Sequence, residues 1–301
     1  MAKKKDEQQP VTPKKPHADL PVPRGKLLAI GGKESKDSEA QTEVQRYSKD
    51  FIKKEILTRF VQELKGESPM IAVLPTASGE PEESAKSYIK VFSDLGVKDV
   101  QVLDIRDRPD AMLEENCDIL RRAAGIMITG GDQLKLTAIL GGTSFLETMK
   151  ERYAYSDFII AGTSAGAAAL STPMIYEGQE AHGMLKGGVR ITTGLEFLKN
   201  VAIDTHFIER GRIVRMAQCI ATNPGCIGIG LEEDTAILVT EGRKVEVLGT
   251  GLVTVVDGMK ITRNTIYQIE SGQPFSLCDL RVHLMAEGET YTLPVFEQLI
   301  S

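Results

Sequence analysis

A short run of residues, Asp157–Leu170, limits most strongly what this chain can fold into. It reads DFIIAGTSAGAAAL: an apolar stretch, then Gly-Thr-Ser-Ala-Gly, then small helix-forming residues. This order is typical of a nucleophile elbow, a sharp strand-to-helix turn that exposes a serine hydroxyl. Gly162 and Gly166 flank Ser164 at two residues on each side, where a Cβ would crowd the turn. The alternative is a tight structural turn whose serine only caps the helix.

Apolar runs and helical patterns alternate over the first half of the chain. Strands are expected at Lys26–Gly32, Met70–Pro75, Val100–Leu103 and Gly125–Thr129, and helices at Arg46–Lys65, Glu82–Leu95 and Ala111–Ala123. The alternation predicts an α/β fold with a mostly parallel central sheet flanked by helices. From Gly228 onward, short strands and glycine turns dominate. They are expected to complete or flank the same sheet, in part antiparallel.

Composition excludes several classes of protein. A net charge of −6 over 301 residues argues against a general nucleic-acid binder, whose affinity would rest on a basic surface. Four cysteines occur without a C-x-x-C pair, which fits neither a zinc site nor a disulfide framework, so reduced and mostly buried thiols are expected. No metal or cofactor motif is visible, and no G-x-G-x-x-G occurs.

The chain is expected to be cytoplasmic and to divide into two parts. No apolar stretch approaches membrane-spanning length, and the N-terminus lacks the apolar core of a secretory signal. Residues 1–24 are rich in Lys and Pro and nearly devoid of apolar side chains, which predicts a disordered tail. Residues 25–301 are expected to form a single α/β domain.

A serine nucleophile needs a base, and only four histidines are available. His17 lies in the tail, and His283 sits in an alternating, strand-like segment. His182 follows the elbow helix in a glycine-rich loop. His206 ends the apolar run VAIDTH, where a strand-end loop would direct it to the same sheet edge as Ser164. We therefore favour His206 as the base, with His182 as the alternative and a purely structural histidine as the third possibility.

Two further segments carry residues suited to the same chemistry. Arg210, Arg212 and Arg215 follow His206 directly, and clustered guanidinium groups suit carboxylate or phosphate recognition. Consecutive glycines in ITGGDQLKL follow an expected strand, so the N–H of Gly131 could join that of Ala165 as an oxyanion hole. A plain glycine turn is the alternative for this second segment.

These motifs together resemble those of the cyanophycinases, within the wider family of peptidase E-like serine peptidases. The matching residues are TGGDQ at 129–133, GTSAGA at 162–167, D-x-HF-x-x-R-x-R-x-x-R at 204–215 and GIGLEEDTAI at 228–237. The similarity runs from about Gly25 to the C-terminal region. The motif with three arginines is the most specific, because other elbow hydrolases do not carry it.

The resemblance implies a fold, an activity and roles for residues. It implies a peptidase E-like, class I glutamine amidotransferase-like α/β fold, usually as a homodimer and without a cofactor. The implied activity is that of a serine exopeptidase that releases β-Asp-Arg dipeptides from cyanophycin, an arginine-bearing poly-aspartate. Ser164 would be the nucleophile and His206 the base. The implied substrate-binding residues are Gln133, Asp204, Arg210, Arg212 and Arg215.

The resemblance places the triad acid in the loop after the elbow helix. That loop contains both Glu177 and Glu180, and the spacing favours Glu180. The order Ser, Glu, His along the chain would also be that of an elbow hydrolase.

One residue departs from the family pattern. Cyanophycinases typically read Asp-Gln-His-Phe where this chain has Asp-Thr-His-Phe, with Thr205 in place of the glutamine. Losing the amide would leave polar substrate groups unpaired at ~1–3 kcal/mol each. A related aspartyl or isoaspartyl peptide is therefore an alternative substrate. Two other classes also stay open: a glutaminase-type amidotransferase, which would carry cysteine at the elbow, and a non-catalytic binder of acidic ligands.

Overall fold

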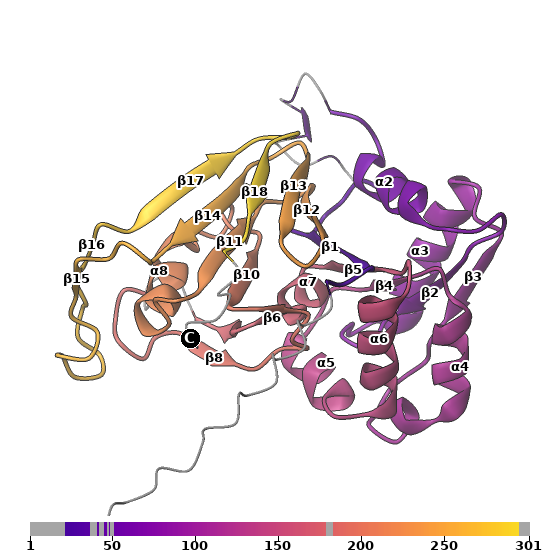
Figure 1. Cartoon of the computed structure of the whole chain (residues 1–301), viewed down its shortest axis with the longest axis horizontal. Coiled ribbons are helices and arrows are strands. Elements are labelled where there is room, and N and C mark those ends of the chain that lie inside the picture. Colours follow the sequence, from indigo (N-terminus) through magenta and orange to yellow (C-terminus); the bar gives the residue numbers. More distant parts are fainter. Residues whose placement is uncertain are drawn as a thin grey trace, which may run out of the picture.

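The computed structural model describes residues 22–36, 41, 45–46, 48, 51–178 and 183–294. The tail expected over residues 1–24 therefore lies, except for its last three residues, outside the described part. The described residues build two mixed sheets with helices packed around them (Figure 1).

The larger sheet has eight strands in the order β18-β13-β12-β1-β5-β4-β2-β3. The five strands from β1 to β3 in this order run parallel, as the alternating pattern predicts. They are β1 (Lys26–Ile30), β2 (Met70–Leu74), β3 (Asp99–Val102), β4 (Gly125–Ile128) and β5 (Ile159–Thr163). The antiparallel remainder is β12 (Thr235–Thr240), β13 (Lys244–Gly249) and β18 (Thr290–Thr292).

Helices cover both faces of this sheet, because its central strands are apolar on both sides. Leu27 and Ala29 of β1 pack into one apolar cluster together with side chains of α4 and α6, and Leu28 and Ile30 pack into a second cluster with those of α2 and α3. The helices are α2 (Glu55–Glu63), α3 (Pro81–Asp94), α4 (Glu114–Arg122), α5 (Gln133–Leu140), α6 (Ser144–Tyr155), α7 (Ala165–Ala169) and α8 (Ile213–Thr222), with a 3₁₀ turn at Asp110–Met112.

The strands after residue 226 divide between two sheets. Strands β12, β13 and β18 complete the first sheet, as expected. Strands β11, β14 and β17 join a second, six-stranded sheet in the order β17-β14-β11-β10-β6-β9, against which α8 packs. Its strands are β6 (Ser171–Thr172), β9 (Leu198–Lys199), β10 (Val201–Thr205), β11 (Ile227–Leu231), β14 (Val253–Asp257) and β17 (Arg281–Met285). Two short hairpins remain, β7 (Met174–Glu177) with β8 (Arg190–Thr192) and β15 (Arg263–Asn264) with β16 (Leu277–Cys278).

The two sheets meet around the short helix α7, which contacts β1 and β5 on one side and β10 on the other. In the first sheet the last residues of β1 and β5, Ile30 and Thr163, are paired. In the second, Thr205 at the end of β10 is paired with Leu231 at the end of β11. The residues that follow these four strands therefore converge at the junction of the two sheets.

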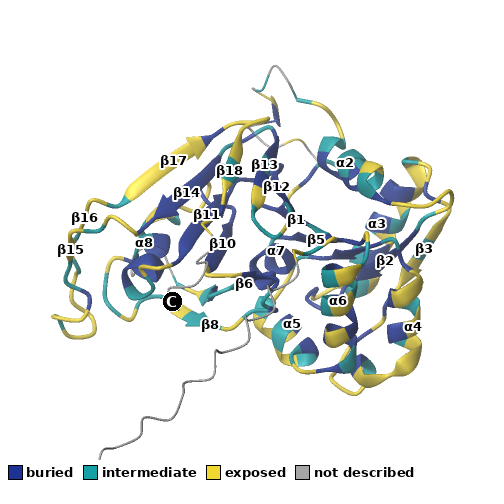
Figure 2. Cartoon of the chain, in the orientation of Figure 1, coloured by how far each residue is buried: buried dark blue, intermediate teal, exposed yellow. Residues whose placement is uncertain are grey.

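Burial agrees with this arrangement. The inner strands of both sheets are buried, whereas the outer helix surfaces and β17 are exposed (Figure 2). All four cysteines are free, and all but Cys278 are buried, as expected from their spacing. Within the described ranges, no helix combines the length and apolar character needed to span a membrane, and no group of three or more His, Cys, Asp or Glu side chains is arranged to hold a metal ion.

The elbow turn generates a stability prediction. A Cβ added at Gly162 would lie 2.6 Å from the backbone carbon and oxygen of Gly166. Gly162→Ala must therefore push β5 and α7 apart, and we expect it to lower the free energy of unfolding by about 1–3 kcal/mol in urea titrations. Gly79→Ala is the matched control, because a Cβ there would meet nothing within 4 Å. Equal stability of the two variants would contradict the packing described for the elbow.

Candidate active site

Ser164 occupies the elbow that the sequence predicts. It follows β5 directly and precedes α7, with φ 50° and ψ −110°, a backbone conformation that non-glycine residues seldom adopt. Its backbone N–H donates to the carbonyl of Ile30 at 2.9 Å. The side chain is half-buried. The strained turn thus holds the Ser164 hydroxyl at the junction of the two sheets.

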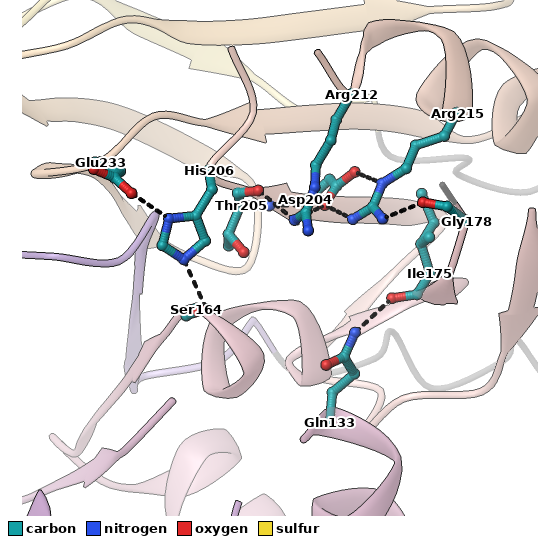
Figure 3. Close-up of polar contacts among 10 residues, drawn as sticks. All are labelled: Gln133, Ser164, Ile175, Gly178, Asp204, Thr205, His206, Arg212, Arg215 and Glu233. Carbon is teal, nitrogen blue, oxygen red and sulfur yellow. Dashed lines mark hydrogen bonds and ion pairs between the residues drawn. The ribbon is translucent and has the colours of Figure 1, made fainter. Parts of the chain in front are cut away.

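His206 lies within hydrogen-bond reach of Ser164. The Oγ of Ser164 and the Nε2 of His206 are 3.1 Å apart, although the two residues belong to different sheets (Figure 3). His206 follows β10, has φ 49°, and its backbone N–H donates to the carbonyl of Gly31 at 3.2 Å. Of the two candidate bases, the structure brings His206 to the serine. His182 lies outside the described residues.

Glu233 contacts the other ring nitrogen of His206. Its Oε1 lies 2.7 Å from Nδ1, and both side chains are buried (Figure 3). Sequence reasoning did not single out Glu233, although it lies in the glycine-and-acid segment GIGLEEDTAI. Of the two acids expected at this place, Glu180 lies outside the described residues. Glu177 is exposed and pairs with Arg190 at 3.3 Å.

The environment of His206 favours its neutral form. Burial lowers its pKa, and the charges of Arg210 and Arg212 lower it further, whereas Glu233 opposes them. Because a carboxylate can only accept hydrogen bonds, Nδ1 of His206 carries the proton in the contact with Glu233. The lone pair of Nε2 then faces the Ser164 hydroxyl, as proton removal from that hydroxyl requires.

Ala165 and the turn after β4 lie beside Ser164. Ala165 is the first residue of α7, so its N–H has no partner within the helix. The turn after β4 runs alongside, because a Cβ added at Gly130 would lie 3.4 Å from the Cβ of Ser164. Gly131 has φ 140°, and a side chain there would overlap the carbonyl of Ala77. Ala165 thus follows Ser164 directly, and Gly131 lies in the turn whose first glycine packs against Ser164.

An ion-pair cluster joins three of the five expected substrate-binding residues, Asp204, Arg212 and Arg215. Asp204 accepts from Arg212 Nη1 at 3.0 Å and from Arg215 Nε at 2.5 Å, and Arg215 Nη2 makes a third contact with the same carboxylate. The guanidinium of Arg215 also donates, through Nη1, to the carbonyl of Gly178 at 3.1 Å (Figure 3). Arg215 is buried, whereas Arg210 is exposed. Sequence reasoning assigned these side chains to the substrate pocket but did not predict that Asp204 pairs with Arg212 and Arg215.

Gln133 and Thr205 lie on either side of this cluster. Gln133 begins α5 and donates through Nε2 to the carbonyl of Ile175 at 3.1 Å (Figure 3). Thr205, the departure from the family pattern, is buried at the end of β10 next to His206. Its backbone carbonyl accepts from Arg212 Nη1 at 2.5 Å.

One segment contacts Ser164, His206 and the turn that carries Glu233. We call residues 30–36 the β1 loop. The carbonyls of residues 30–32 accept, in turn, the backbone N–H groups of Ser164, His206 and Asp234 at 2.9, 3.2 and 2.8 Å. Three consecutive peptide units thus align the nucleophile, the base and the turn that carries Glu233. The sequence shows only a glycine pair here and no sign of this role.

A buried carboxylate anchors the β1 loop. Glu34 accepts from the Oγ1 of Thr163 at 2.6 Å, accepts from the hydroxyl of Tyr88, and pairs with Lys36 at 2.9 Å. Burial would raise its pKa, but Lys36 and the two hydroxyls outweigh burial and hold the pKa below its usual value. The ionised side chain thereby ties the loop to the end of β5, one residue before Ser164, and to α3.

The comparisons with known proteins agree with this geometry. Several classes of serine hydrolase share an α/β fold with a serine at its elbow and a histidine against that serine. The comparisons identify this chain as a serine-type peptidase. The family model described as "Peptidase family S51" matches residues 28–247. The chain belongs to this family.

Curated relatives and a solved structure extend the comparison. A protein named cyanophycinase from Thermosynechococcus vestitus is 35% identical over 90% of this chain and 80% of its own length. Another cyanophycinase, from Geminocystis herdmanii, is 33% identical over 89% of this chain and 93% of its own length. The crystal structure of a peptidase from an acI-B1 actinobacterium superposes with a TM-score of 0.60 at 19% identity, over 91% of this chain and 99% of that chain. The expected fold class is thereby confirmed.

The contact between Gly32 and His206 gives a prediction about activity. A Cβ added at Gly32 would lie 2.5 Å from Cε1 and 2.7 Å from Nε2 of His206. We expect Gly32→Ala to displace the imidazole and to lower kcat/KM on the order of 100-fold, because small misplacements of catalytic groups are costly.

Gly66→Ala is the control for Gly32→Ala. The two glycines have nearly the same φ, 105° and 107°, but a Cβ at Gly66 would meet nothing within 4 Å. Both variants therefore carry the same backbone strain, and only the first carries the clash. Steady-state kinetics beside thermal melts separate the two effects. Equal kcat/KM in both variants would refute a role for the Gly32 contact.

Proposed function

We propose that this chain is a serine exopeptidase that hydrolyses cyanophycin to β-Asp-Arg dipeptides. The observation that carries the proposal is the relay from Ser164 through His206 to Glu233, with separations of 3.1 and 2.7 Å. The substrate class is supported by the curated relatives named cyanophycinase, which match about nine-tenths of this chain.

The reaction begins at Ser164. Its Oγ attacks the carbonyl carbon of the backbone amide between two aspartyl units while His206 Nε2 takes the hydroxyl proton, and the β-amide that links aspartate to arginine stays intact in the dipeptide. The N–H groups of Gly131 and Ala165 hold the oxyanion that forms. The imidazolium then gives its proton to the departing amine, which leaves an acyl-enzyme. Water, deprotonated by the same imidazole, attacks the ester and releases the acid product and the free serine.

We assign the orienting acid to Glu233. Its carboxylate fixes the Nδ1–H tautomer and stabilises the imidazolium that forms during proton transfer. Supporting observations are its 2.7 Å contact with His206 and its burial. Under this assignment, Glu180 does not take part in the relay.

The choice of acid is testable with two amide variants. Glu233→Gln leaves the size of the side chain unchanged but removes its charge and favours the wrong tautomer, so we expect kcat to fall by about 10³–10⁴-fold. Glu180→Gln should retain kcat within about threefold, since no step of the proposed reaction uses its carboxylate. Kinetics on the two purified variants decide the matter. A large loss in Glu180→Gln with little loss in Glu233→Gln would reverse the assignment.

The three arginines, Arg210, Arg212 and Arg215, are proposed to bind the acidic groups of the substrate. Arg210 is the exposed member, and Arg212 and Arg215 are held in place by Asp204. Bidentate guanidinium groups suit aspartate carboxylates. Gln133 is proposed to add a polar contact from α5, and Thr205 to shape the pocket beside His206. An aspartyl or isoaspartyl peptide is the alternative substrate, because Thr205 replaces the family's glutamine.

We further propose that the protein acts in the cytoplasm as a homodimer. Support for association comes from β17, an edge strand of the second sheet on which Val282 and Leu284 are 47% and 61% exposed. Among the described residues β17 pairs on one side only, and exposed apolar side chains along such an edge favour a partner. Residues 25–301 are proposed to act as one domain, since both sheets supply parts of one site.

Hydrolysis of purified cyanophycin tests the proposed activity. We expect the wild-type protein to release β-Asp-Arg, identified by mass spectrometry, because the serine relay is assembled. Ser164→Ala should lose nearly all turnover, since the members of a relay act as a unit. Retained activity in Ser164→Ala would refute the mechanism. Wild-type activity on short isoaspartyl peptides but not on cyanophycin would show that the proposed substrate is wrong while the serine mechanism stands.

A further inference from the structure

Lys33 of the β1 loop contacts the same carboxylate oxygen as His206. Its Nζ lies 3.0 Å from Oε1 of Glu233, and that oxygen lies 2.7 Å from His206 Nδ1. Because both contacts meet at one atom, the ammonium and the imidazole are separated by at most about 6 Å, within the range of appreciable charge–charge interaction. The Lys33 side chain is 58% exposed and that of Glu233 is 8% exposed. A solvent-facing cation thus reaches a buried member of the relay.

The backbone makes this contact specific. Lys33 has φ 46°, in the left-handed region, and follows Gly32, whose backbone packs against the imidazole. The carbonyl of Gly32 is bonded to the N–H of Asp234, next to Glu233 in sequence. The backbone on both sides of the ion pair is therefore fixed, so only the side chain of Lys33 has to be ordered to form the pair.

The other charged groups around His206 come from four segments. The loop after β10 supplies Arg210 and Glu209, whose Oε1 accepts the backbone N–H of Glu233 at 3.2 Å. The start of α8 supplies Arg212, which Asp204 of β10 largely neutralises. The β11–β12 turn supplies its acids, Glu232, Glu233 and Asp234, of which Glu233 contacts the imidazole. Within the β1 loop, Glu34 and Lys36 pair with each other.

We propose that Lys33 is a positioning residue that sets the pH at which His206 becomes an active base, through the carboxylate oxygen that the two residues share. The inference rests on the proposed role of His206 as the base. The positive charge of Lys33 partly satisfies Glu233 and disfavours a second positive charge on the imidazole. The base therefore remains unprotonated, and Ser164 remains activated, to a lower pH than it would without Lys33.

The sign of the effect follows from the charges. Protonation of His206 removes the lone pair needed at Nε2, so activity is lost as the pH falls through the pKa of His206. Burial and the arginines already lower that pKa. Removing the Lys33 charge makes the imidazolium more favourable. The acid limb of the pH profile must then move to higher pH, by about 0.5–1 pH unit for a partly exposed charge at this separation.

The test measures inactivation by an uncharged fluorophosphonate as a function of pH. This probe reports the activation of Ser164 without ionisable groups of its own. In Lys33→Gln we expect the acid limb of the second-order inactivation rate constant to move to higher pH by about 0.5–1 pH unit. At a pH below the limb, the variant should therefore react roughly 3- to 10-fold more slowly than wild type. Lys33→Arg should restore the wild-type limb, and 1 M salt should narrow the difference between wild type and Lys33→Gln.

Lys244→Gln is the matched control. Lys244 is 56% exposed and pairs with Glu241 in the β12–β13 turn, at the opposite end of β12 from the site. The acid limb of the Lys244→Gln variant should coincide with that of the wild-type protein. An unshifted acid limb in Lys33→Gln would overturn the proposal. If KM for cyanophycin then rose while the limb stayed in place, Lys33 would only bind substrate. A wild-type profile without an acid limb would overturn the proposed base as well.

Discussion

The three carbonyl groups at the start of the β1 loop are the constraint on which the rest of the site depends. Ser164, the proposed nucleophile, follows a strand of one sheet, whereas His206 and Glu233, the proposed base and acid, follow strands of the other. Packing of apolar side chains brings the sheets together but does not fix the position of polar groups to within a fraction of an ångström. Directional hydrogen bonds from residues 30–32 to Ser164, His206 and Asp234 supply that precision. The buried Glu34 then holds the loop itself in place.

Backbone strain is concentrated at the same junction. Lys33, Ser164, His206 and Asp234 all have φ between 46° and 52°. Such conformations cost on the order of 1–3 kcal/mol each, and they persist only where the surroundings determine them. Here the surroundings are the interiors of two sheets, which hold the strained turns in the geometry that proton transfer requires. The stability of the apolar cores thus offsets the strain of the site.

The sequence predicts the parts of this structure that depend on local patterns. The elbow at Ser164, the parallel strands and the position of His206 follow from apolar periodicity and glycine placement, and all are present. The distribution of the later strands between two sheets could not be predicted, because strands of either sheet carry the same alternating pattern. Nor could Glu233 be chosen among three consecutive acids. In space they separate: Asp234 accepts the N–H of Ser35 at 3.0 Å, Glu232 lies against Gly251, and Glu233 alone meets His206.

The central claim is that His206 activates Ser164 as a nucleophile. Mass mapping of the protein after reaction with a fluorophosphonate tests it most directly, because the adduct records which residue attacked. The account predicts one adduct, on Ser164, that forms readily in the wild-type protein and at a greatly reduced rate in His206→Ala. An adduct on another residue, or an equal rate of labelling in His206→Ala, would contradict it.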